Sequence, residues 1–283
     1  MIPQSQIAKL SNRLLKEQGG KRIPEHLLER DYCIAWFLVG LSRSPLRNKL
    51  AFKGGTALRR CHFSDYRFSE DLDFTLLQSL SFDELKQEFD PVYEEVKQAS
   101  NITFRLSRHD PTIHQNSYTF YLMYEGPLPA TSTPKEIKVD ITIKEKIFYA
   151  PEERAVLKGC DEFTDLPEGE KILVYSLREI AIEKIVALLD RARTEPRDLY
   201  DLWYLTEQSN SVELGDCLEA INAKLAHRGK KLDEVRGEFY KKETRLKKTW
   251  ETRLSTQMAN LSMFDNVYRA VKRTFRQAKI TDA

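Results

Sequence analysis

The sequence lacks the features that mark membrane and secreted proteins. Among its 283 residues, no apolar run reaches the roughly 18 residues needed to cross a bilayer. The first residues show no basic stretch followed by an apolar one, so no secretory signal is indicated. The densest apolar run, Cys33 to Leu41, is about half the length of a membrane span and predicts a buried helix. We therefore expect a cytoplasmic protein without a membrane partner.

Cysteine is sparse as well. The four thiols are widely scattered, and no pair has the spacing of zinc ligands, which argues against a zinc site and against a disulfide framework. They are Cys33, Cys61, Cys160 and Cys217. No internal repeat or low-complexity tract is visible, which leaves an ordinary globular protein of one large or two medium domains.

The chain as a whole has almost no excess of one charge sign, but its C-terminal part does. The formal net charge is +2, yet residues 221–283 carry 16 Lys and Arg against 7 Asp and Glu, a local charge of +9. The other 220 residues carry −7. This polarity suggests an acidic catalytic part and a basic part that could hold a polyanion.

Hydrophobic periodicity predicts an α+β fold, with a mixed sheet in the first half and helices in the second. Residues 1–150 form the expected core with N-terminal helices, and residues 151–283 the expected helical domain. Helices are expected before residue 45, over 81–99, and from Ser176 onward, where Ser176 and Glu179 suggest a capping box. The expected strands are 50–52, 71–76, 102–106, 118–124 and 137–143.

Two carboxylates lie two residues apart on the strand that contains Leu72 and Phe74. Because side chains alternate along a strand, Asp71 and Asp73 face the same side. Oxygen ligands without His or Cys suit Mg²⁺, and phosphoryl-transfer sites commonly hold two such ions. Asp140 lies on the polar face of a later strand, and as a neighbour it would add a metal ligand or a base. The alternative is a solvated strand face.

A glycine pair follows the strand at 50–52 and precedes a helix. Gly54 and Gly55 would let the backbone approach a phosphate, and the N–H groups of a helix that begins at Thr56 would attract it. A plain turn is the alternative for this pair.

Basic residues on an apolar helix give a further indication. On a helix from Leu177 to about Arg193, Lys184 and Arg191 lie among apolar residues and are expected to point inward, towards carboxylates or a triphosphate. Extension of both side chains to the surface is the alternative. The expected solvent face carries Glu179, Glu183 and Asp190. Asp198, near the start of the next helix, is expected inward too, although the helix dipole alone would favour it there.

Basic residues between Lys230 and Arg253 interleave with aromatic residues, and a second basic cluster lies at 269–276. Such a mixture suits RNA backbone and single-stranded ends. Ordinary solvated helix faces are the alternative. The aromatic residues are Phe239, Tyr240, Trp250, Tyr268 and Phe275.

Four motifs in order resemble the AbiEii/AbiGii toxin family of nucleotidyltransferases. They are Phe52-Lys53-Gly54-Gly55-Thr56 with Arg67-Phe68-Ser69-Glu70-Asp71-Leu72-Asp73-Phe74; Lys138-Val139-Asp140-Ile141; Glu183-Lys184 through Arg191; and Arg197-Asp198-Leu199-Tyr200-Asp201. The resemblance implies a DNA polymerase β-like nucleotidyltransferase fold with a helical C-terminal domain. It also implies a toxin of a toxin–antitoxin and phage-defence system, with a cognate antitoxin protein as partner.

The resemblance further implies a nucleoside triphosphate (NTP) as substrate, Mg²⁺ as cofactor, and an RNA acceptor such as the 3′ end of tRNA, whose modification stops translation. Asp71 and Asp73 would hold metal, with Asp140 as third ligand, and Lys184 and Asp198 would be essential; Asp201 is the alternative to Asp198. The triphosphate would contact Lys53, Gly54, Gly55, Thr56, Ser69, Lys184 and Arg191. A non-catalytic nucleotide- or RNA-binding protein with the same fold is the competing hypothesis.

Overall fold

A computed structural model describes residues 1–18, 21–109 and 116–282 of the chain. It divides into two compact units: residues 1–145 with 151–174, and residues 146–150 with 175 to the C-terminal end. The sequence placed the boundary at residue 150, but the chain returns to the first unit after it. The reason is a strand pair, β6 (Glu152–Ala155) and β7 (Lys171–Val174), which the hydrophobic pattern did not reveal. Strand β7 pairs in parallel with β1 (Leu50–Lys53).

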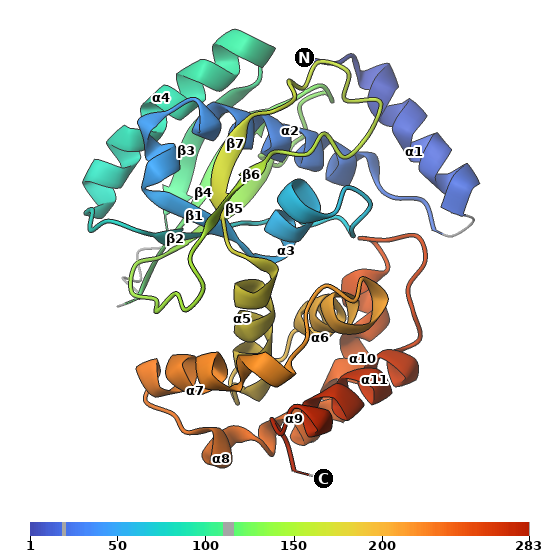
Figure 1. Ribbon diagram of the computed structural model, residues 1–283. Coiled ribbons are helices and arrows are strands. Elements are labelled where there is room, and N and C mark those ends of the chain that lie inside the picture. The colour runs from blue at the N-terminus through green and yellow to red at the C-terminus, as the bar shows by residue number, and fades with distance from the viewer. Residues whose placement is uncertain (19–20, 110–115, 283) are drawn as a thin grey trace. The chain divides into compact units, whose positions relative to one another are not determined.

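The first unit contains a seven-stranded mixed sheet in the order β3-β4-β5-β2-β1-β7-β6 (Figure 1). Its other strands are β2 (Leu72–Leu76), β3 (Thr103–His109), β4 (Ser117–Glu125) and β5 (Glu136–Thr142). The pairs β2–β5 and β1–β7 are parallel, and the other neighbouring pairs are antiparallel. The predicted α+β class with a mixed sheet is confirmed, and the expected strands lie within two or three residues of those observed.

One face of this sheet is apolar and is covered by helices. Phe52 of β1 and Phe74 of β2 are register partners with ring centroids 5.0 Å apart. Phe89, on α4 (Phe82–Ser100), packs on Phe120 of β4 and on Phe37 of α2 (Glu25–Ser42) at 5.6 and 6.0 Å. Helix α1 (Gln4–Gln18) packs against α2. The opposite face of the central strands is thereby left to their polar side chains.

Local sequence sets the ends of α4. Ser81 and Glu84 form a reciprocal capping box at its start, which satisfies N–H groups that have no partner within the helix. Asn101 ends it in the left-handed region at φ +60°. Helix α4 therefore begins one residue after the predicted start, with the cap residue itself outside the helix.

A buried ionic network fixes the segment after β1. This segment comprises α3 (Gly54–Ala57) and a π-helical turn, η2 (Leu58–His62). The Arg59 and Arg60 guanidinium groups lie 2.9 and 2.5 Å from the Asp31 carboxylate on α2, and all three side chains are buried. Such a network is costly to break because loss of one member leaves a buried charge unpaired. It therefore anchors η2, which follows α3 directly, to α2.

The second unit is helical, as predicted. Its main helices are α5 (Leu177–Leu189), α6 (Pro196–Trp203), α7 (Leu218–His227), α10 (Glu243–Leu254) and α11 (Phe264–Gln277). Two short helices, α8 (Leu232–Val235) and α9 (Glu238–Lys241), lie between α7 and α10. No described helix is at once long and apolar enough to span a bilayer.

Aromatic residues of the basic segment form the core of this unit. Phe239 packs on Tyr268 and Phe275 with centroids 4.9 and 4.8 Å apart, and Trp250 packs on Phe264 at 5.5 Å. All five side chains are buried. The prediction that these aromatics are available for RNA bases is therefore wrong for Phe239, Trp250, Tyr268 and Phe275.

The predicted solvent exposure of the acidic face of α5 is wrong for Glu179. The Glu179 carboxylate is fully buried, lies 2.8 Å from the buried Lys224 ammonium, and accepts hydrogen bonds from the backbone N–H groups of Phe148 and Tyr149. Ser176 caps the Glu179 N–H, but Glu179 is engaged elsewhere and does not complete the capping box. These contacts explain why residues 146–150 belong to the second unit.

Candidate active site

A row of polar side chains crosses four neighbouring strands of the first unit. Lys53 is the register partner of Asp73, Asp73 of Asp140, and Asp140 of Thr119. Residues directly opposite each other in a sheet project from the same face. Asp71 immediately precedes β2, and its charge, like that of Asp73, acts on Lys138 of this face. The predicted pairing of the Asp140 strand beside the Asp73 strand is thus observed, and it places these two half-buried carboxylates on one face.

Asp140 is bound by neighbours on both sides. Its carboxylate accepts a hydrogen bond from the Thr119 hydroxyl at 2.5 Å and forms an ion pair with the Lys138 ammonium. Partial burial opposes the charge on Lys138, but Asp140, with Asp71 and Asp73 beyond it, outweighs burial and raises the pKa of Lys138. The three carboxylates therefore already attract a cation.

The same residues provide a test of the expected Mg²⁺ site. Among residues 1–18, 21–109 and 116–282, no three His, Cys, Asp or Glu side chains are arranged to hold a metal ion. However, the donors on this face are carboxylate and hydroxyl oxygens, which are the ligands of a hard divalent cation. The Lys138 ammonium is a cation in their field. The donor chemistry of this face therefore fits Mg²⁺, although the described side chains are not arranged around one point, and Asp71, Asp73 and Asp140 stay predicted ligands.

The glycine pair approaches this row closely. Gly54 has φ +77°, and a Cβ on it would lie 2.5 Å from Asp73 Oδ2. A Cβ on Gly55 would lie 2.6 Å from an Arg67 guanidinium nitrogen and 3.3 Å from Ser69 Oγ. Only glycine combines a left-handed φ with so close an approach. The turn thus brings backbone against a carboxylate, a guanidinium and a hydroxyl.

Two side chains that were predicted to contact the triphosphate form hydrogen bonds within the first unit. The Thr56 hydroxyl is fully buried and donates a hydrogen bond to the Asp71 carbonyl oxygen at 2.5 Å. The Lys53 ammonium donates to Thr142 Oγ1 at 3.1 Å. Thr56 therefore fixes the chain at Asp71, and its role towards a triphosphate remains a prediction, as do those of Lys53, Gly54, Gly55 and Ser69.

Arg67 is a residue of this face to which the sequence assigned no role. Its side chain is only 5% exposed, and it donates to the Phe68 carbonyl oxygen at 3.2 Å. A buried guanidinium beside a glycine turn suits an anion. The only sequence indication was its place two residues before Ser69 in the motif.

In the second unit, Lys184 is inward-facing, as predicted. Its ammonium on α5 lies 2.8 Å from the carboxylates of both Asp198 and Asp201 on α6. Burial opposes the charge on Lys184, but the two aspartates outweigh it and raise its pKa. Burial likewise opposes ionisation of Asp198, but Lys184 and Arg193 hold its pKa below the usual range. Both aspartates that the sequence left as alternatives thus contact the same lysine.

Arg191 does not point inward, and the reason is the end of the helix. Helix α5 ends at Leu189, and Asp190 leaves helical geometry at ψ 120°. The Lys242 ammonium satisfies the last carbonyl groups, those of Ala187, Leu188 and Asp190. The Arg191 side chain is consequently 85% exposed. Arg193, which the sequence did not single out, instead contacts Asp198 Oδ2 at 2.7 Å.

Comparisons with known proteins bear on the family and the fold of this chain. The family described as nucleotidyl transferase AbiEii toxin, type IV toxin–antitoxin system, matches residues 36–277. MenT4, a nucleotidyltransferase toxin from Mycobacterium tuberculosis H37Rv, has a similar fold, with a TM-score of 0.65, 17% identity, and coverage of 96% of this chain and 90% of that one. JHP933 from Helicobacter pylori gives a TM-score of 0.53, 16% identity, and coverage of 90% and 93%. No curated protein matches the sequence.

Proposed function

Because the chain belongs to the AbiEii family of nucleotidyl transferase toxins of type IV toxin–antitoxin systems, we propose that it transfers a nucleotide from an NTP to RNA. The 3′ end of tRNA is the proposed acceptor, and its modification would block translation and growth. The family implies an NTP substrate and an antitoxin partner. The observation that best supports the transfer is the register of Asp73 with Asp140 beside the Gly54 turn.

In the proposed reaction, the acceptor's 3′-hydroxyl oxygen attacks the α-phosphorus and the bond to the β-phosphate oxygen breaks. Pyrophosphate leaves, and the hydroxyl proton passes to the Asp140 carboxylate. Mg²⁺, held by Asp71, Asp73 and Asp140, would neutralise phosphate oxygens. The backbone N–H groups at Gly54 and Gly55, together with Ser69, would orient the triphosphate. Lys184 and Asp198 are proposed to be essential to the same reaction.

Label transfer from each NTP in turn tests this function. Purified protein is incubated with deacylated total tRNA and one α-labelled NTP, with Mg²⁺ or with a chelator. We expect label on tRNA from one NTP or a few, only with Mg²⁺, and a loss of about 100-fold or more in Asp71→Asn, because such a variant removes transition-state charge stabilisation. Circular dichroism confirms that each variant is folded.

A second experiment links the chemistry to toxicity. Expression of the wild-type chain should arrest growth, and both Asp71→Ala and Lys184→Met should relieve the arrest at equal protein levels. Toxicity that persists in both variants would contradict a catalytic toxin. NTP binding without any label transfer would instead favour a non-catalytic nucleotide- or RNA-binding protein.

A further inference from the structure

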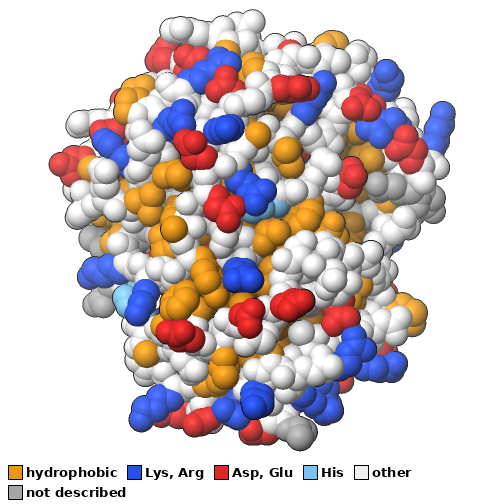
Figure 2. Space-filling model, in the orientation of Figure 1, with side chains coloured by type: hydrophobic (Ala, Val, Ile, Leu, Met, Phe, Trp, Pro, Cys, Tyr) orange, Lys and Arg blue, Asp and Glu red, His pale blue; other side chains and the backbone are white. Residues whose placement is uncertain are grey.

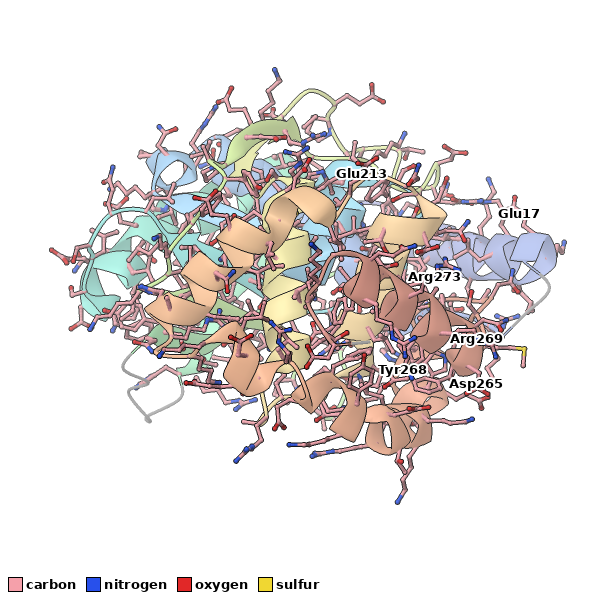
Figure 3. The ribbon with its side chains drawn as sticks, turned by 60° about the horizontal axis from the view of Figure 1, so that its bottom comes forward. Glu17, Glu213, Asp265, Tyr268, Arg269 and Arg273 are labelled. Carbon is pink, nitrogen blue, oxygen red and sulfur yellow. The ribbon has the colours of Figure 1, made fainter. Side chains whose placement is uncertain are left out.

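Helix α11 carries a stripe of cations along its exposed side. Arg269, Lys272, Arg273 and Arg276 recur at intervals of three and four residues, which places them on one helix face over about 10 Å. We call them the α11 stripe; with Gln277 they line a shallow depression of about 420 Å³. Arg269 and Arg273 are labelled along the helix in Figure 3. The other face of α11 is buried through Phe264, Val267, Tyr268, Val271 and Phe275.

Charge compensation distinguishes the α11 stripe from three of the basic residues that precede it. Arg236 forms ion pairs with Asp233 and Asp282, Lys241 with Glu238, and Lys247 with Asp265. Over the C-terminal helices, blue side chains are accordingly interspersed with red ones (Figure 2). These three cations of the first basic cluster are therefore neutralised within the molecule.

The α11 stripe has little such compensation. Arg273 pairs with Glu207 at 2.7 Å. Among the residues that the structure describes, Arg269, Lys272 and Arg276 have no acidic partner within 4.0 Å; Lys272 lies over the Tyr240 ring at 5.2 Å. Three of its four charges are thus available to a ligand.

These cations oppose the stability of their own helix. Like charges three or four residues apart on a helix repel, and the stripe contains four such pairs. The helix dipole favours cations only in the last turn, so it accounts for Arg276 but not for Arg269, Lys272 or Arg273, which lie earlier in the helix. A polyanion bound along the stripe would remove this repulsion.

We propose that the α11 stripe binds the phosphate backbone of the RNA acceptor; this inference rests on the proposed function and adds a second binding surface to it. Between residues 269 and 277 the exposed face carries no large apolar side chain, whereas a protein interface normally buries some at its centre. The nearby aromatics Tyr268 and Phe275 are buried, so bases are not stacked there. The α11 stripe would contact phosphate groups, so its binding to RNA would not depend on base sequence.

Salt dependence of RNA binding tests the proposal. Binding of full-length protein to deacylated total tRNA is measured without NTP between 50 and 400 mM salt for the wild type and for Arg269→Gln/Lys272→Gln/Arg276→Gln. Each lost phosphate contact lowers the slope of log K against log salt by about 0.7–0.9. The triple variant should therefore lose about 2 from the slope and bind roughly 10- to 50-fold more weakly at 0.15 M salt. Arg273 is left in place because it also holds Glu207.

A matched triple variant, Arg236→Gln/Lys241→Gln/Lys247→Gln, changes the net charge equally but removes cations that are already paired. It should alter the slope by less than about 1. Equal effects of the two triples, or no effect of the first, would overturn the proposal. Loss of binding to a co-expressed antitoxin with unchanged RNA binding would also overturn it, since the stripe would then be a protein-docking surface. The single variant Arg269→Gln, with a slope change of about 0.8, serves if the triple variant does not fold.

The proposed function and the proposed role of the α11 stripe can be refuted independently of each other. A wild-type protein that binds tRNA through the stripe but transfers no nucleotide would refute the proposed function alone. A triple variant that binds and labels tRNA like the wild type would refute the stripe alone. Hairpin RNAs of different sequence and equal length should compete within about threefold of one another, because phosphate contacts carry no sequence information.

Discussion

Replacing Gly54 with alanine tests how far the glycine turn depends on its closeness to Asp73. An L-residue at φ +77° costs about 1–2 kcal/mol. The new Cβ would also lie 2.5 Å from Asp73 Oδ2, so the carboxylate must leave its rotamer at a further cost of about 0.5–1.5 kcal/mol. We expect Gly54→Ala to lose about 1.5–3.5 kcal/mol of unfolding free energy in all.

The effect on nucleotide transfer should exceed the effect on stability. Displacement of a catalytic group by about 1 Å can cost about 100-fold in rate, and Asp73 is a candidate metal ligand. Label transfer at saturating NTP measures this loss, and urea unfolding measures the loss of stability. We expect transfer to fall by about 100-fold while the folded fraction at 25 °C stays near that of the wild type.

Gly169→Ala is a matched control for the backbone cost. Gly169 has φ +88°, but a Cβ on it meets nothing within 4 Å. It should therefore lose only the conformational part, about 1–2 kcal/mol, and keep its transfer activity. Equal stability losses in the two variants, with transfer retained in Gly54→Ala, would refute the inferred approach of Gly54 to Asp73.

Three further predictions concern buried polar groups. Thr56→Val should destabilise by about 1–2 kcal/mol because the part-buried hydrogen bond to the Asp71 carbonyl is lost, whereas Thr56→Ser should not. A raised KM for NTP without loss of stability would instead show a substrate contact. Lys224→Met should cost about 3–5 kcal/mol of unfolding free energy, since it leaves the fully buried Glu179 carboxylate without its cation. Urea unfolding measures this loss, with Lys231→Met as a control at an exposed site. Asp198 has a lowered pKa in the folded protein, so its stabilising contribution is complete above its unfolded pKa of about 3.9 and is lost as pH falls below that value. Asp198→Asn should abolish this part of the acid-induced loss of stability. An unchanged dependence of unfolding free energy on pH between 2 and 5 would contradict the assignment.

Much of the sheet and of its polar face could be predicted from alternation alone. Side chains along a strand alternate between two faces, so Asp71 and Asp73, and separately Asp140, could be assigned to a polar face before any pairing was known. The α5 helix was harder. Its apolar residues surround the whole helix, and Glu179 and Glu183 looked like a solvent face because their partner Lys224 lies 41 or more residues away. Periodicity shows polarity, but it does not show whether a polar group has a distant partner.

The helix end shows the same limit at short range. Arg191 was placed inward by extending a helical wheel past Leu189, where the chain turns away. There the Lys242 ammonium, from more than 50 residues along the chain, binds the terminal carbonyl groups. Arg193 could contact Asp198 only because the helix stops there.

The local amino-acid sequence alone thus determined the alternation along the strands, the cap of α4, the glycine turn and the family motifs. Each of these features depends only on residues a few positions apart. Tertiary structure decided which charges meet: Asp73 with Asp140 by strand register, Lys184 with both Asp198 and Asp201, and Glu179 with Lys224. It also decided that the aromatics of the basic segment are core and that the α11 stripe keeps three uncompensated cations. The physical reason is that electrostatic pairing and burial depend on distances in space, which sequence spacing does not contain beyond a single helix or strand.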